Sequence, residues 1–95
     1  MTPRADTSDT QTRLISQALV IYQEIVNAIE RLQGNREDVA RVRIFVTERE
    51  DTEAVVRAFK ESFGDVRPAA TLIVGSRFVD KYMKAEIEAD AVVLV

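Results

Sequence analysis

Apolar residues recur along the first third of the chain at alternating steps of three and four positions. They are Ile15, Ala18, Tyr22, Ile25, Ile29 and Leu32. This spacing places the side chains on one face of a helix, which we expect to run from Thr10 or Gln11 to Gln33. Further apolar residues, Leu14, Leu19, Ile21 and Val26, widen that face. Gly34 is expected to end the helix, because glycine adopts the left-handed conformation at little steric cost.

The next segment, from Val39 to Thr47, alternates between two kinds of position. Ala40, Val42, Ile44 and Val46 fall on one side, and Arg41, Arg43 and Phe45 on the other. The period of two and the β-branched residues predict a strand. After it, Asp51 or Thr52 can cap a second helix, whose apolar residues keep helical spacing as far as Gly64.

The C-terminal part predicts two further strands. Pro68 disfavours helix, and residues 69–74 read as a strand that ends at a loop around Gly75. The final strand is expected from Lys84 to about Val95. It places small and aliphatic residues on one face and three acids, Glu86, Glu88 and Asp90, on the other.

The predicted order is therefore helix, strand, helix, strand, strand, which is an α+β fold. We expect residues 1–9 to form a flexible polar leader and residues 10–95 to form a single domain. Two helices can cover only one face of such a sheet, and three strands are few for two helices of this length. A neighbouring subunit, or a part missing from this chain, is expected to complete the fold.

Composition narrows the possible functions. The 95 residues suffice for one compact domain, and so small a domain exposes much of its surface, which favours oligomers. Cysteine and histidine are both absent. Their absence excludes disulfides, thiolate nucleophiles, a Ser-His-Asp triad and the common zinc sites, so no metal centre is expected.

Charge and motif patterns argue against several partners. The net charge is −3 and no basic stripe exists, so nucleic acid is not an expected partner. No apolar run approaches the roughly 20 residues of a membrane span, so we expect a soluble cytoplasmic protein. The three glycines lie far apart and form no phosphate-binding loop, so no cofactor is expected.

Four short segments share their order and approximate spacing with a known family. They are Gln11-Thr12-Arg13, Glu37 to Thr47, Phe63 to Thr71, and Ala85 to Ala89. With these segments the chain resembles the RidA/YjgF family, also called endoribonuclease L-PSP-like proteins, over residues 11–93. The resemblance implies a chorismate-mutase-like α+β fold. It also implies a homotrimer with small-metabolite sites in the clefts between subunits.

The resemblance also implies a chemistry. Family members hydrolyse 2-imino acids to 2-keto acids and ammonia without a cofactor, using an arginine that grips the carboxylate and a glutamate that positions water. The glutamate position matches Glu86, but the arginine position is Ala70. Alanine offers neither charge nor donors, so deaminase activity is expected to be weak or absent. Arg67 or Arg77 could supply a substitute guanidinium.

Two further departures from the family pattern concern its cleft. Val56 stands where the family often has an asparagine on the second helix. The family's N-terminal β-hairpin, with its Gly-Pro-Tyr-Ser-like segment and a site tyrosine, has no counterpart before Gln11. Three explanations are open: a short form of the domain, a translation start further upstream, or a sequence that is a trimmed part of a longer chain.

Other candidate residues have competing structural explanations. Thr47 ends a strand where family clefts often lie, so it is a candidate ligand contact. The acids Glu88 and Asp90 are expected to pair with Arg41 or Arg43 across the sheet, or to face solvent. For Glu86 the catalytic and structural interpretations remain equally open.

Three functions remain after this comparison. The first is a small-metabolite-binding protein with weak or absent imine deaminase activity. The second is a cofactor-independent hydrolase or deaminase of altered specificity, acting on an imine or carbonyl compound. The third is a structural or interaction subunit without a ligand.

Overall fold

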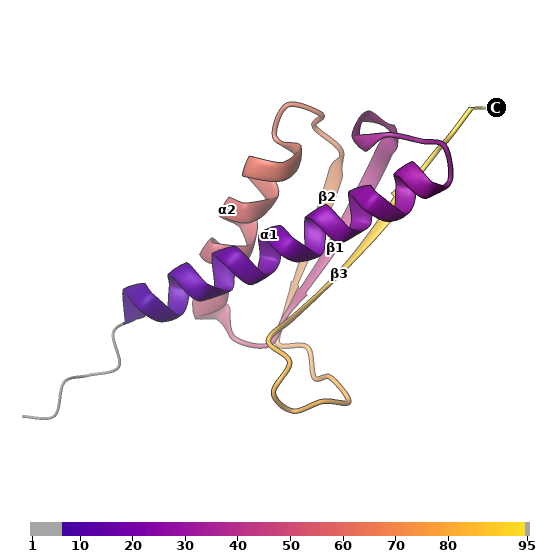
Figure 1. Cartoon of the computed structure of the whole chain (residues 1–95). Coiled ribbons are helices and arrows are strands. Elements are labelled where there is room, and N and C mark those ends of the chain that lie inside the picture. Colours follow the sequence, from indigo (N-terminus) through magenta and orange to yellow (C-terminus); the bar gives the residue numbers. More distant parts are fainter. Residues whose placement is uncertain (1–6, 95) are drawn as a thin grey trace, which may run out of the picture.

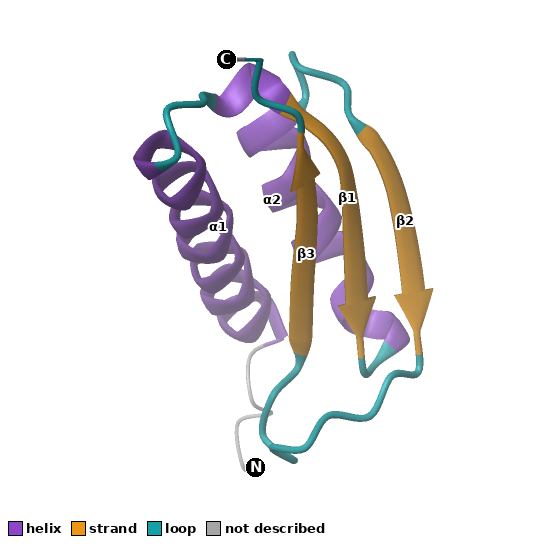
Figure 2. Ribbon diagram, turned by 90° about the vertical axis from the view of Figure 1, so that its right-hand side faces the viewer, coloured by secondary structure: helices purple, strands orange, loops and turns teal. Residues whose placement is uncertain are grey.

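The computed structural model describes residues 7–94. The elements in chain order are α1 (Thr7–Arg31), η1 (Arg36–Asp38), β1 (Val39–Val46), η2 (Arg49–Asp51), α2 (Thr52–Phe63), β2 (Ala69–Val74) and β3 (Ala85–Ala91). Both helices lie on one side of the three-stranded sheet (Figures 1 and 2). The predicted α+β fold and its order of elements are confirmed.

Several ends of the elements differ from the sequence prediction, most of them by one or two residues. Helix α1 begins at Thr7, three residues before the expected start at Thr10, so residues 7–9 of the expected leader are helical. The remainder of that leader lies outside the described residues. Strand β3 ends at Ala91 rather than near Val95. Beyond it, the N–H of Val92 donates to the carbonyl of Asp38 at 3.0 Å.

In the turn after α1, the left-handed residue is not the one predicted. Gln33, not Gly34, takes the left-handed conformation, with φ of 67°. Gly34 is required for a different reason, because a Cβ there would lie 2.6 Å from Cγ2 of Val93 and 2.8 Å from Cγ2 of Ile29. The glycine therefore lets the segment after β3 approach the end of α1.

The sheet has the strand order β2-β1-β3. Strand β1 runs parallel to β2, with α2 in the connection, and antiparallel to β3. In the register, Ile44 of β1 lies beside Leu72 of β2 and Ile87 of β3. Side chains alternate between the faces of a sheet, so this row fixes which residues of all three strands face the helices.

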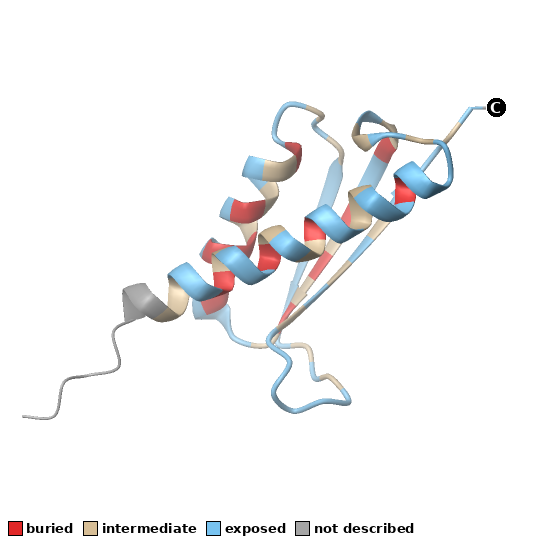
Figure 3. Cartoon of the chain, viewed as in Figure 1, coloured by how far each residue is buried: buried red, intermediate tan, exposed pale blue. Residues whose placement is uncertain are grey.

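The core lies between the two helices and β1, as Figure 3 shows. Tyr22 and Phe63 are its largest fully buried side chains, and their rings meet edge to face with centroids 5.7 Å apart. The hydroxyl of Tyr22 donates to the carbonyl of Val55 at 3.4 Å, and burial raises the pKa of that hydroxyl. Tyr22 is thus a core residue, as its place on the apolar stripe predicted.

An ion pair fastens the start of β1 to the end of α2. Arg36 donates to both carboxylate oxygens of Asp65, at 2.6 and 2.9 Å, and to the carbonyl of Ser62 at 3.1 Å. The hydrogen bonds from Arg36 lower the pKa of Asp65 from its ordinary 3.8 to about 2.

This pair predicts a loss of stability in acid. A carboxylate whose pKa is lowered on folding stabilises the protein above the unfolded pKa, and that contribution disappears as pH falls through the folded pKa. Wild type should therefore have a higher urea midpoint than Asp65→Asn at pH 5, and the difference should shrink between pH 4 and about 2. Glu61→Gln, which removes an exposed acid without an ion pair among the described residues, is the control. A pH-independent difference would contradict the assignment.

The sheet face opposite the helices is not covered by any described residue, and β2 is exposed along its whole length (Figure 3). No described helix is long and apolar enough to cross a membrane.

Candidate functional site

Glu86 lies near the start of β3, on the open face of the sheet. It is the cross-strand neighbour of Phe45, which in turn lies beside Ile73 of β2. Its side chain is exposed and forms no ion pair with any residue in the described part of the chain. A free carboxylate beside an aromatic ring is available to contact a ligand or a neighbouring subunit.

Arg43 occupies the centre of the open face and binds the other two acids of β3. Its Nε lies 3.1 Å from Glu88, and its two terminal nitrogens lie 2.9 and 3.1 Å from the carboxylate oxygens of Asp90. Hydrogen bonds from Arg43 lower the pKa of Asp90, and those acceptors raise the pKa of Arg43. The predicted cross-strand pairing of Glu88 and Asp90 is confirmed for Arg43.

Thr47 and Arg77 lie at the same end of the sheet as Glu86. The N–H of Thr47 donates to the carbonyl of Lys84 at 3.0 Å, which joins the end of β1 to the start of β3. The N–H groups of Gly75 and Ser76 donate to the carbonyl of Val46, at 2.9 and 3.1 Å. These bonds hold the loop that carries Arg77 against the end of β1.

Ala70 and Arg67 lie at the opposite end. Ala70 is the neighbour of Val42, which is buried beneath the helices, so Ala70 belongs to the helix side of the sheet and Glu86 to the open side. Arg67 precedes β2 and takes the left-handed conformation, with φ of 56°. The structure thus brings Glu86, Thr47 and Arg77 to one end of the sheet and places Ala70 and Arg67 elsewhere.

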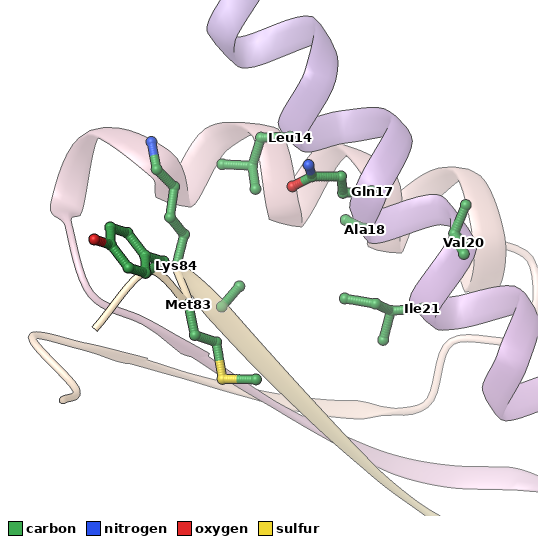
Figure 4. A pocket seen from close by; sticks show the side chains of 9 residues that line it. Leu14, Gln17, Ala18, Val20, Ile21, Met83 and Lys84 are labelled. Atoms are coloured by element: carbon green, nitrogen blue, oxygen red, sulfur yellow. The ribbon is translucent and has the colours of Figure 1, made fainter. Parts of the chain in front are cut away.

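A separate set of residues forms hollows between α1 and β3. The larger hollow measures about 500 Å³, and Figure 4 shows side chains of α1 facing Met83 and Lys84 across it. A second hollow of about 320 Å³ continues along the helix to Leu32. Neither was predicted, although the unusually wide apolar arc of α1 was a signal that the helix needs covering on two sides.

A smaller hollow of about 160 Å³ adjoins the larger one and is lined by Leu14 and by four polar or charged residues, Thr10, Arg13, Gln17 and Lys84. The carboxylates do not form a metal site, because no group of three or more His, Cys, Asp or Glu side chains in the described part of the chain could hold an ion.

Comparisons with known proteins agree with this fold. The sequence profile described as Endoribonuclease L-PSP matches residues 2–93. An uncharacterized protein of Streptomyces coelicolor is 36% identical over 75 residues, which is 79% of this chain and 56% of that protein. The chain therefore spans little more than half the length of this relative.

Two crystal structures are similar at the level of fold and sequence. A Mycobacterium tuberculosis member of the YjgF/YER057c/UK114 family is 30% identical, with a TM-score of 0.70 over 75% of this chain and 60% of that one. A Pseudomonas aeruginosa protein of unknown function is also 30% identical, with a TM-score of 0.71 over 78% of this chain and 54% of that one. The profile match over nearly the whole sequence, with these structural neighbours, shows that the chain belongs to the RidA/YjgF (endoribonuclease L-PSP) family.

Proposed function

We propose that this protein binds a small metabolite in clefts between subunits, as a homotrimer, and has weak or no 2-imino acid deaminase activity. The observation that carries the proposal is Ala70 at the position of the family's carboxylate-binding arginine. Without a guanidinium, a small carboxylate substrate loses its charge-assisted bidentate anchor.

The placement of the motif residues supports a cleft between subunits. Ala70 and Glu86 belong to opposite faces of one sheet, and side chains on opposite faces diverge. A small ligand on a single chain therefore cannot contact both positions. A site that uses both the Ala70 position and Glu86 requires residues from two subunits.

The exposed surfaces support oligomer formation. Phe45 and Ile73, the latter 40% exposed, leave the open face partly apolar, and Leu72 and Val74, 38% and 42% exposed, leave apolar surface on the helix side of the edge strand β2. Apolar area of this kind is stabilised by removal from water at about 25 cal/mol per Å². A second subunit packed on the open face and around the β2 edge would bury it.

The direct test is a coupled assay that follows release of the 2-keto acid from a freshly generated 2-imino acid. We expect the wild type to hydrolyse it little faster than buffer, and Glu86→Gln to behave like wild type. Thr71→Ser, a small change on the exposed strand β2, is the control for differences between protein preparations. A wild-type rate near that of an arginine-containing relative would refute the proposal.

A second candidate is an enzyme of altered specificity for an imine or carbonyl compound. It is favoured by one observation, which is that Arg77 shares an end of the sheet with Glu86 and Thr47. In that case Glu86→Gln and Arg77→Ala should each lower turnover of the active compound without changing the urea midpoint.

A further inference from the structure

In the part of the sheet that the structure describes, the open face carries three acids and two arginines. Arg43 lies opposite Glu88, and Arg41 lies opposite Asp90. Hydrogen bonds from Arg43, joined by the charge of Arg41, lower the pKa of Asp90. These two arginines and two acids therefore compensate one another. The third acid, Glu86, has no basic partner among the described residues.

Glu86 stands in a row with one aromatic and one aliphatic residue. In the register, Phe45 lies between Glu86 of β3 and Ile73 of β2. Directly opposed residues of antiparallel strands have Cβ atoms about 4.5–5.5 Å apart, so one small ligand can reach both the carboxylate and the ring. Phe45 is half-buried and Ile73 is 40% exposed, so the row is open to solvent. It offers a cation a charge-assisted hydrogen bond and the negative face of a ring.

Neither a metal ion nor an anion suits this row. Ca²⁺ and Mg²⁺ take about six oxygen ligands, whereas no group of three or more His, Cys, Asp or Glu side chains in the described residues could hold an ion. An anion would be repelled by Glu86, and the Ala70 position offers it no guanidinium. The ligand that fits is an organic cation.

The loop between β2 and β3 supplies three basic residues, none of which pairs with Glu86. The Nζ atom of Lys81 lies 5.3 Å from the centre of the Tyr82 ring. Lys84 lines the hollows between α1 and β3, on the helix side of the sheet (Figure 4). Arg77 forms no ion pair with Glu86. The charge of Glu86 is therefore available to a ligand.

We propose that the ligand of this cleft is a small organic cation, an alkylammonium compound whose charged group binds Glu86 and whose apolar body lies on Phe45 and Ile73. This inference rests on the proposed function, because it names the ligand class of the same metabolite site. The absence of a guanidinium at position 70 serves both proposals, since it removes the anchor for a carboxylate and the charge that would repel a cation.

Three compounds of nearly equal shape separate charge from size. Isopentylamine is cationic at neutral pH, isopentanol is neutral and isovalerate is anionic. Each is titrated into the isotope-labelled full chain, and binding is followed by amide chemical shifts. We expect isopentylamine to bind at least about tenfold more tightly than either of the others. Its shifts should fall in residues 85–88 and around Phe45 and Ile73.

Two variants assign the preference to charge at this site. Glu86→Gln keeps the shape of the side chain, and should weaken isopentylamine binding about tenfold while leaving isopentanol binding unchanged. Glu61→Gln, which removes an exposed acid of α2, is the matched control and should bind like wild type. Ala70→Arg should reverse the preference, so that isovalerate binds more tightly than isopentylamine.

Isovalerate bound as tightly as isopentylamine by wild type would overturn the cationic ligand class and leave the metabolite cleft standing. An unchanged affinity in Glu86→Gln, or chemical shifts confined to α1, would overturn it equally. So would failure of all three compounds to bind. The proposed function fails separately, in the keto acid assay, if wild type hydrolyses a 2-imino acid at a rate near that of an arginine-containing relative.

Discussion

Replacing Phe63 with alanine is expected to destabilise the fold by about 3–5 kcal/mol, the usual cost of removing a buried aromatic side chain. Phe63 is fully buried, and its ring contacts the rings of both Tyr22 and Phe59, with centroids 5.7 and 6.1 Å away. A domain of this size is stable by about 5–15 kcal/mol in total, so the loss removes a large share of the stability and should lower the urea midpoint markedly. Urea titration followed by circular dichroism measures the loss.

The matched control for Phe63→Ala is Val79→Ala, at a fully exposed position. It should change stability by less than about 0.5 kcal/mol. Both variants should be measured at two protein concentrations, because association with other subunits raises apparent stability by mass action. A loss below about 1 kcal/mol for Phe63→Ala would mean that the aromatic cluster does not hold the helices together in solution.

Placing arginine at position 70 is expected to create imine deaminase activity. A charge-assisted pair in a desolvated site is worth about 2–5 kcal/mol, which corresponds to roughly 30- to 4,000-fold in kcat/KM. Ala70 is exposed on an edge strand, so the longer side chain can be accommodated without repacking the core. The measurement is the keto acid assay described above, with wild type and Ala70→Arg compared at equal concentration.

Two further variants test whether bidentate binding by arginine and the carboxylate of Glu86 explain the activity of Ala70→Arg. Ala70→Lys adds the same charge without the planar fork, so it should recover much less activity. The double change Ala70→Arg with Glu86→Gln should return activity to the wild-type level if the glutamate positions the water. Activity in Ala70→Lys equal to that in Ala70→Arg would argue against bidentate recognition at this position.

Much of the fold could be predicted because apolar residues recur at regular spacing in the helices and in β1. The step of two from Val39 to Thr47 predicted β1, and the position of Pro68 set the start of β2. The turn after α1 was harder, because Gly34 looks like a helix stop whether its φ is positive or not. What fixes that glycine is the approach of Val93 from the far end of the chain, which no local pattern contains.

The sequence could predict which residues belong to the candidate site, but not on which face of the sheet each of them lies. Residues 69–74 form a nearly continuous apolar run, so alternation cannot say which of them face the helices. The register with β1 decides it and places Ala70 beside Val42. For the same reason, the separation of Ala70 from Glu86 could not be read from the family motifs. The pairing of Arg43 with Glu88 and Asp90 was predictable, because alternation assigned all three to one kind of face.

The position of β1 in the middle of the sheet has a consequence for synthesis. A ribosome produces β1 before either of its neighbours, and its antiparallel partner β3 arrives last, with Val39 meeting Ala91 at the far end of the ladder. Contacts this distant in sequence form slowly, because the chain must first close a long loop. Until β3 emerges, β1 has only β2 to pair with, and its other edge stays without a strand partner.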